Sequence, residues 1–198
     1  MFADGFARVT ANGIGWLRCY LVPMSNYRRA RTAGGTYFFT VVTAHRRALL
    51  ANTDAITALR ASVAAVRREL PFSVDAWVVL PEHMHVIWTL PPGDRDFSRR
   101  WGRIKAGFTR RHVVGHVSAQ RHDSGLWQPR FWEHLVRDDA DFAAHADYLH
   151  YNPVKHGLVT RVIDWPYSSF HRAVQRGVYA PDWGSSEPEI ARDSTFGE

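Results

Sequence analysis

The amino-acid sequence predicts an α+β fold built on a four-stranded antiparallel sheet. Segments rich in β-branched and aromatic residues alternate with segments whose apolar residues recur at helical spacing, and proline or glycine separates most of them. The expected order is strand, helix, strand, strand, helix, strand, helix. The first six elements match a split βαβ arrangement with both helices on one face of the sheet, and the last helix is an addition to it. With 198 residues, of which 45% are hydrophobic, the chain suffices for one domain with its own core.

The first predicted strand and helix lie at residues 36–43 and 51–70. The strand has the sequence TYFFTVVT and follows a Gly-Gly turn signal. The helix has apolar residues at helical spacing, and Asn52 or Thr53 is placed to cap its N-terminus. Pro71 is expected to end it, because proline lacks the backbone N–H that a helix needs.

Two further strands are predicted at residues 72–80 and 83–90. Pro81-Glu82 separates them, so they are expected to pair antiparallel. Residues 97–112 predict a basic helix, and the polar residues 113–125 predict a loop.

The last strand and helix are predicted in the final third of the chain. Residues 131–136 have the strand sequence FWEHLV. Asp138 or Asp139 is then placed to cap a helix that runs to about Asn152, where Pro153 is expected to end it.

The two ends of the chain are expected to lie outside this pattern. Residues 1–23 have no clear periodicity and suggest a flexible upstream extension, with Met24 as an alternative start. Residues 24–163 then form the main domain. Residues 164–198 form an aromatic-rich tail whose last part, from Ser185, is expected to be disordered.

The charge balance favours a polyanionic partner. Lysine and arginine number 25 against 19 acidic residues, a formal net charge of +6, and such a balance is typical of proteins that bind nucleic acid or an acidic membrane surface. No apolar run reaches the roughly 18 residues that span a bilayer, so no membrane association is expected. Cys19 is the single cysteine, which excludes a disulfide framework and fits a reducing cytoplasm. With nucleic acid as the expected partner, a cytoplasmic, nucleoid-associated protein is expected.

The sequence His83-Met84-His85 lies on a predicted strand. Side chains two residues apart on a strand point to the same face, so both imidazoles are able to share one metal ion while Met84 points into the core. Because the chain contains 11 histidines, two surface histidines at this spacing are an equally simple interpretation.

Tyr148 and Asn152 are four residues apart on a predicted helix and therefore share one face. The amide oxygen of Asn152 is a suitable third ligand for a hard cation, and the phenol of Tyr148 is a candidate nucleophile for phosphorus. The alternative is that Tyr148 packs in the core and that Asn152 caps the end of the helix.

Two basic clusters suggest contacts with nucleic acid. One is the helix at 97–112, where Trp101, Ile104 and Phe108 recur at helical spacing and are expected in the core, while packing does not explain the arginines. Those arginines also fit a solvated helix face. The other cluster begins at Tyr27 and suggests an arm over DNA. The candidate DNA-binding residues are Tyr27, Arg28, Arg29, Arg31, Arg99, Arg100, Arg103, Lys105, Arg110 and Arg111.

Five blocks of sequence resemble REP-associated tyrosine transposases, a family of the HUH class in which U is a hydrophobic residue. They are NYRRA from residue 26, GGTYFFT from 34, LPEHMHVIW from 80, LWQPRFWEH from 126 and YLHYNPVKHGLV from 148. The tail sequence WPYSSF also fits. The resemblance covers residues 25–184, and the order of the blocks makes it specific.

The resemblance implies a ferredoxin-like fold and a divalent metal, Mg²⁺ or Mn²⁺. It implies cleavage of single-stranded DNA beside hairpins of the repetitive extragenic palindrome type, through a 5′-phosphotyrosine. The metal ligands fall on His83, His85 and Asn152, and the nucleophile falls on Tyr148. Tyr151 competes for that role, but it points about 60° away from the face of Asn152.

Other functions remain open at this stage. A protein that binds hairpin DNA as a regulator without cleaving it is the main alternative. Replication initiators and relaxases of the HUH class are usually larger than this chain. Phosphate-binding P-loops, HExxH zinc sites and GxSxG elbows are absent from the sequence. The oligomeric state, monomer or homodimer, is left open.

Overall fold

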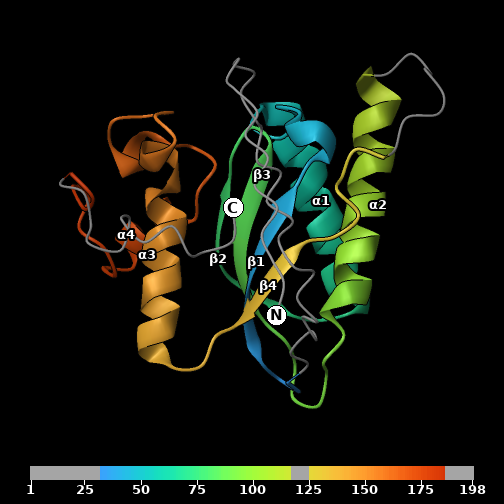
Figure 1. Cartoon of the computed structure of the whole chain (residues 1–198), viewed down its shortest axis with the longest axis horizontal. Coiled ribbons are helices and arrows are strands. Elements are labelled where there is room, and N and C mark those ends of the chain that lie inside the picture. Colours follow the sequence, from blue (N-terminus) through green and yellow to red (C-terminus); the bar gives the residue numbers. More distant parts are fainter. Residues whose placement is uncertain (1–31, 117–124, 186–198) are drawn as a thin grey trace, which may run out of the picture.

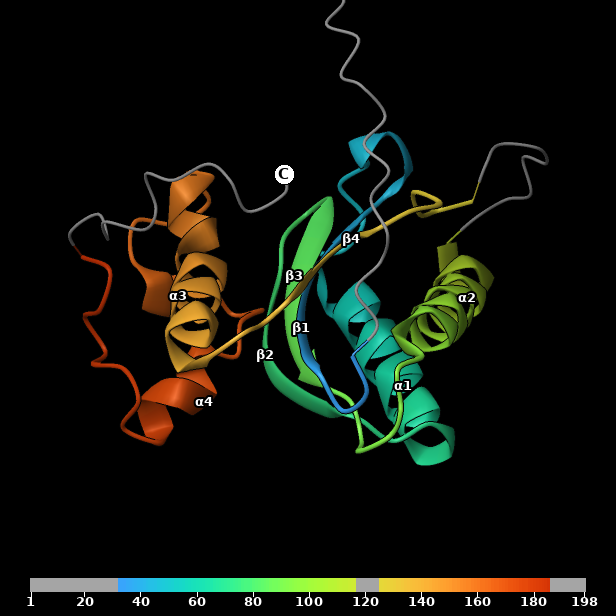
Figure 2. The same cartoon turned by 60° about the horizontal axis from the view of Figure 1, so that its bottom comes forward.

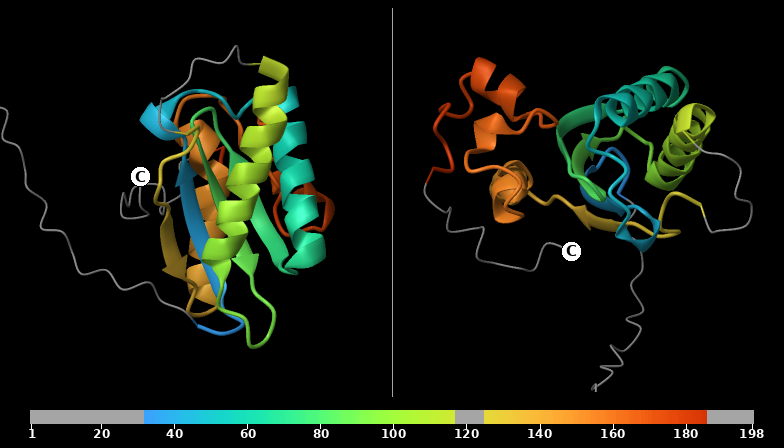
Figure 3. Two further views of the ribbon diagram at one scale, coloured as in Figure 1. Left: turned by 90° about the vertical axis from the view of Figure 1, so that its right-hand side faces the viewer. Right: turned by 90° about the horizontal axis from the view of Figure 1, so that it is seen from above.

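The computed structural model describes residues 32–116 and 125–185, and these residues form three layers (Figures 1 and 3). A four-stranded sheet lies in the middle. The helices α1 (Thr53–Glu69) and α2 (Phe97–His116) cover one face, and α3 (Asp139–Lys155) with the short α4 (Phe170–Gln175) lies on the other face. The α+β prediction is therefore confirmed, including the added helix, which occupies the face that the split βαβ unit leaves open.

The sheet has the strand order β2-β3-β1-β4, and every neighbouring pair is antiparallel. Its strands are β1 (Thr36–Val42), β2 (Ser73–Val79), β3 (His83–Thr89) and β4 (Trp132–Leu135). This order places β1 and β3 in the centre, where both faces of the sheet are covered. Their near-continuous apolar sequences follow from that position.

The larger core lies between the sheet and the helices α1 and α2. Alternate residues of β1 and β3, including Phe39 and Trp88, point into it, together with Trp101, Ile104 and Phe108 of α2. All five side chains are almost fully buried, as their spacing predicts. Asn52 is the N-cap of α1, because its side chain accepts a hydrogen bond of 2.9 Å from the backbone N–H of Ala55.

The helix α3 continues one turn beyond the predicted end and contains Pro153. The prediction that Pro153 ends the helix is therefore wrong, and so is the alternative that Asn152 is the C-cap, because the C-cap is His156. Proline in the last turn removes only one intrahelical hydrogen bond, and packing of the buried Pro153 compensates for it. The chain leaves the helix at Gly157, whose φ of +66° suits glycine.

Within the predicted tail, residues 164–185 cover the edge of the sheet that β2 forms. The backbone N–H of Ser169 donates to the Trp77 carbonyl (2.9 Å), and that of Val79 donates to the Tyr167 carbonyl (2.9 Å). The guanidinium of Arg172 donates to the Asp75 carbonyl at 2.8 Å. These bonds satisfy groups that an edge strand would otherwise expose, which explains why the WPYSSF block follows the domain. Residues 1–31, which include the predicted upstream extension 1–23, and residues 186–198 lie outside the described residues.

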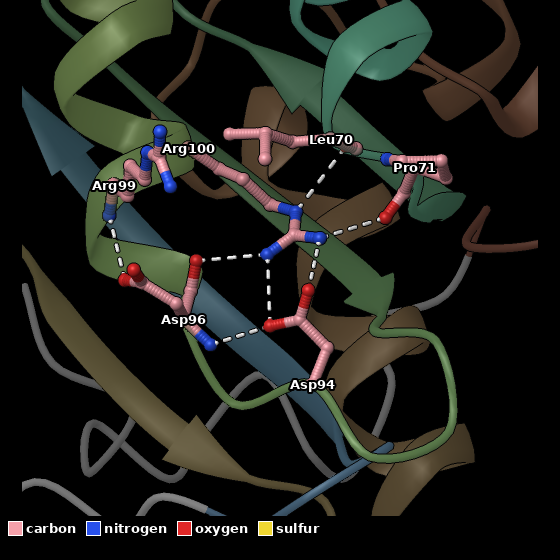
Figure 4. Close-up of polar contacts among 6 residues, drawn as sticks. All are labelled: Leu70, Pro71, Asp94, Asp96, Arg99 and Arg100. Atoms are coloured by element: carbon pink, nitrogen blue, oxygen red, sulfur yellow. Dashed lines mark hydrogen bonds and ion pairs between the residues drawn. The ribbon is translucent and has the colours of Figure 1, made fainter.

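Arg100 belongs to the core of the fold (Figure 4). Its guanidinium is only 1% exposed and donates to both carboxylate oxygens of Asp94, at 3.1 and 2.6 Å. It also donates to the carbonyls of Asp96 (2.9 Å), Leu70 (3.4 Å) and Pro71 (2.9 Å). Arg100 therefore joins the start of α2 to the end of α1. The expectation that it contacts DNA has to be corrected, because the sequence pattern of a helix face cannot show that a neighbouring loop covers it.

His150 of α3 gives the fold an acid-sensitive contact. The imidazole is 2% exposed, and its Nδ1 lies 3.2 Å from the hydroxyl of Ser168. Burial, followed by the positive charge of Arg172, lowers the pKa of His150 to about 3. Since the folded state disfavours the protonated ring, this stability is present above the ordinary pKa of 6.5 and is lost as the pH falls toward 3.

Replacing His150 with glutamine should therefore reduce the loss of stability in acid. Between about pH 7.5 and about pH 4.5, the free energy of unfolding of the unmodified chain should fall by about 2 to 3 kcal/mol more than that of His150→Gln. Urea unfolding at the two pH values measures this difference. Equal losses for both proteins would contradict the assignment. His171→Gln is the control, because His171 is less buried.

Within the described residues, no helix is long and apolar enough to cross a membrane.

Candidate functional site

His83 and His85 lie side by side on the face of β3 that α3 covers. Their ring centroids are 4.8 Å apart, and both side chains are at most 2% exposed. Met84 between them points into the opposite core, as strand geometry predicts. The two imidazoles are thus buried together, and they are not a pair of solvated surface histidines.

Each imidazole is oriented through its Nδ1 atom. His83 Nδ1 lies 3.1 Å from the carboxylate of Glu82, and His85 Nδ1 lies 2.9 Å from the hydroxyl of Thr40 on the neighbouring strand. Partners of this kind hold metal-binding histidines in one ring orientation and present Nε2 to the ion. The Nε2 atoms of both rings are buried. The sequence pattern did not reveal either contact: that of Thr40 depends on the pairing of β1 with β3, whereas Glu82 directly precedes His83 in the chain.

One face of α3 lies along the histidine pair. It contains Tyr148 and Asn152, and the C-cap residue His156 continues it at the same spacing of four residues. The ring of Tyr148 is 5.3 Å from that of His85, and the ring of His156 is 5.2 Å from that of His83, measured between centroids. Because both ends of this face contact the histidines, Asn152 between them faces the pair.

His156 was not among the predicted site residues. Its spacing of four from Asn152 is visible in the sequence. However, it becomes relevant only because α3 continues through Pro153. The helix that was expected to end at Pro153 would have placed His156 in a loop.

The side chain of Asn152 supports the interpretation as a metal site. It is fully buried, yet among the described residues neither its amide oxygen nor its amide nitrogen has a hydrogen-bond partner. A buried polar group without a hydrogen bond is destabilising by about 1 to 3 kcal/mol, so such groups usually have a functional reason. An amide oxygen next to two imidazoles is a donor set that accepts Mn²⁺ or Mg²⁺, and the residues present therefore fit the expected ion.

Tyr148 faces the histidine pair, whereas Tyr151 lies on another side of the helix. Tyr148 faces His85, and the ammonium of Lys155 lies 4.9 Å from the centroid of its ring. Tyr151 lies on another side of α3, where its ring is so near Gly184 that a Cβ atom there would approach it to 3.3 Å.

A second group of possible metal ligands holds the first half of α3 against β4. His134 Nε2 lies 2.9 Å from one carboxylate oxygen of Asp141, and His145 Nδ1 lies 3.0 Å from the other. The ligand atoms of all three residues lie within 4.8 Å of one another. Arg137 also donates to Asp141, at 3.0 Å.

The charges of this group favour a structural role. Burial acts to raise the pKa of Asp141, but the hydrogen bonds from His134 and Arg137 outweigh it and lower that pKa below its usual range. Burial lowers the pKa of His145. Because the guanidinium of Arg137 also donates to the carboxylate of Asp141, we interpret the three residues as a hydrogen-bonded link between β4 and α3.

The other basic candidates of α2 lie away from the histidine pair. Arg103, Arg110 and Arg111 line a groove of about 340 Å³ between α1 and α2, on the opposite side of the sheet (Figure 2). Arg99 is exposed at the start of the same helix. The ammonium of Lys105 donates to the Gln128 carbonyl at 2.9 Å and lies over the rings of Trp127 and Phe131. The candidates Tyr27, Arg28, Arg29 and Arg31 lie outside the described residues.

Comparison with known proteins finds close relatives. The chain is 52% identical over 168 residues to the REP-associated tyrosine transposase of Escherichia coli K12. The match covers 85% of this chain and 96% of the relative. A protein of Haemophilus influenzae assigned to the same group is 45% identical over 168 residues, covering 82% of this chain and 95% of the relative. No family model matches the sequence.

A solved structure is similar along most of the chain. It is the structure of a REP-associated tyrosine transposase bound to a REP hairpin, with 49% sequence identity and a TM-score of 0.75. The match covers 88% of this chain and 98% of the solved chain.

Proposed function

The chain belongs to the family of REP-associated tyrosine transposases, and on this premise we propose that it cleaves and rejoins single-stranded DNA next to hairpins, in a metal-dependent reaction. The observation that carries the proposal is the phenol of Tyr148 facing a buried histidine pair and the buried amide of Asn152. A hairpin substrate is supported by the solved relative, which is bound to a REP hairpin.

In the proposed reaction, the phenol oxygen of Tyr148 attacks the scissile phosphorus. The bond from phosphorus to the 3′ oxygen breaks, a phosphotyrosine forms on the 5′ phosphate, and the 3′ oxygen takes up a proton while the phenol loses one. One phosphodiester replaces another, so the step is nearly neutral in free energy. A 3′ hydroxyl can reverse it without ATP, which accounts for rejoining.

His83, His85 and Asn152 would hold Mg²⁺ or Mn²⁺ in this site, with Glu82 and Thr40 orienting the two imidazoles. An ion held there would act as a Lewis acid that polarises the phosphate and offsets the charge that develops on it. Lys155 acts on the phenol, because an ammonium beside the ring stabilises negative charge on the attacking oxygen.

The proposal is tested with an oligonucleotide hairpin that has a single-stranded flank and a label on its 3′ end. The labelled fragment should then become attached to the protein and migrate with it on a denaturing gel. The adduct should form with Mn²⁺ or Mg²⁺ and should be absent in EDTA. His85→Ala should reduce its rate of formation on the order of 100-fold, while the Kd for the hairpin should change little.

His112→Ala is the matched control, because it removes an imidazole from α2 on the other side of the sheet. A chain that binds the hairpin tightly but forms no adduct with either ion is a non-catalytic hairpin-binding protein. Adduct formation that is unaffected by both EDTA and His85→Ala would exclude the metal site.

A further inference from the structure

A groove of about 460 Å³ lies beside the histidine pair, where β1 ends and β4 begins. The residues that line it supply arginine, amide and aromatic side chains: Thr40, Val42, Arg46, Gln128, Arg130, Phe131 and Trp132. Several of them belong to the sequence block LWQPRFWEH, for which the proposed reaction gives no role.

The register of the sheet places this groove next to the candidate metal ligands. Thr40 of β1 is paired with Trp132 of β4 on one side and with His85 of β3 on the other. Paired residues point to the same face, so Trp132, Thr40 and His85 form one row across three strands. Val42 is paired with His83 in the same way. A DNA strand with a phosphate at the histidines therefore has its neighbouring nucleotide within reach of the groove.

The turn that presents Arg46 is strained and firmly held. His45 and Arg46 follow β1 with φ values of +56° and +49°, which non-glycine residues rarely adopt. Backbone hydrogen bonds hold this turn to two segments that are distant in the sequence. The backbone N–H of Ala44 donates to the Leu126 carbonyl (2.9 Å), and that of Thr43 donates to the Glu82 carbonyl (2.8 Å). Strained backbone that is held in this way is concentrated at functional sites.

The two arginines of the groove are accessible. The side chain of Arg46 is 51% exposed, and its contact with Glu82, at 3.7 Å, is a weak surface ion pair that a phosphate can replace. Arg130 is exposed and has no hydrogen bond or ion pair within residues 32–116 and 125–185. The side-chain amide of Gln128 likewise has no hydrogen bond to any described residue, so it is available to the edge of a base.

We propose that this groove binds the unpaired nucleotide next to the scissile phosphate. Arg46 and Arg130 bind the flanking phosphates, the indole of Trp132 stacks on the base, and Gln128 contacts the edge of that base. The inference rests on the proposed function, because it assumes that the scissile phosphate binds at His83 and His85.

The test compares two DNA ligands by fluorescence anisotropy, a hairpin with a single-stranded flank and the same hairpin without it. The variant with both Arg46→Ala and Arg130→Ala should bind the flanked hairpin about tenfold or more weakly and the bare hairpin unchanged. The slope of log K against log salt for the flanked hairpin should become shallower by about 1.4, at about 0.7 for each lost phosphate contact on a single strand. Arg68 is an exposed arginine of α1, so Arg68→Ala is the control and should leave the affinity for both ligands unchanged.

The stacking contact is tested by placing an abasic site at each flank position in turn. With the unmodified chain, one position should weaken binding on the order of tenfold, and with Trp132→Ala that position should have no further effect. Trp132→Phe should restore part of the sensitivity, which excludes general loss of structure as the cause. If no flank position depends on Trp132, and the double arginine variant binds both ligands normally, the groove is not a nucleotide site.

These results separate the inference from the proposed function. Normal adduct formation together with unchanged binding of the flank would overturn only the nucleotide site. Absence of the adduct in the unmodified chain, together with weaker binding of the flank by the arginine variant, would overturn only the cleavage reaction.

Discussion

Replacing Tyr148 with phenylalanine is expected to abolish the covalent protein–DNA adduct while leaving the affinity for the hairpin within about threefold. The substitution removes only the attacking oxygen, and the ring keeps its contacts with Phe38 and His85. Folding should therefore be preserved, because a volume-conserving change in a core usually costs less than about 1.5 kcal/mol. The adduct is measured on a denaturing gel with a 3′-labelled oligonucleotide, and affinity is measured separately by anisotropy.

Tyr151→Phe is the matched control. Tyr151 lies three residues away on the same helix but packs toward Gly184, so adduct formation should continue at close to the normal rate. The opposite pattern, with the adduct lost in Tyr151→Phe and kept in Tyr148→Phe, would show that the nucleophile is Tyr151. It would also require α3 to turn by part of a helical revolution when DNA binds.

The largest expected effect on stability is that of Arg100→Met. This change leaves the carboxylate of Asp94 without its charged partner and removes the donor for three backbone carbonyls (Figure 4). Loss of one member of a buried ion pair typically costs about 3 to 5 kcal/mol. Because Asp94 is 31% exposed and water can solvate it, we expect a value near the lower end, about 3 kcal/mol. The midpoint of urea unfolding measures it.

Arg99→Met is the control on the same helix, since its side chain is exposed and packs little. Its effect on stability should stay within about 0.5 kcal/mol. If Arg100→Met unfolds at the same urea concentration as the unmodified chain, the guanidinium does not join α1 to α2. A shallower salt dependence of hairpin binding in a folded Arg100→Met variant would restore the original expectation of a DNA contact.

The sequence alone was sufficient to predict the strands, the main helices and the shared orientation of the two histidines. Each of these follows from local periodicity. Alternation over His83-Met84-His85 places both imidazoles on one face, and spacing of four aligns Tyr148 with Asn152. Proline and cap residues located most of the helix ends within a few residues. They failed at Pro153, because packing of α3 against the sheet compensates for one missing hydrogen bond.

Only the tertiary structure decided which surfaces face each other. The sequence marks Arg100 and Arg103 alike as members of a basic helix, yet one is buried against Asp94 and the other lines an open groove. His156 contacts His83, and Arg46 lines the same groove as Arg130, because the fold brings together parts of the chain that are far apart in the sequence. Burial and hydrogen bonding of a side chain depend on such neighbours, and periodicity describes only the direction in which a side chain points from its own helix or strand.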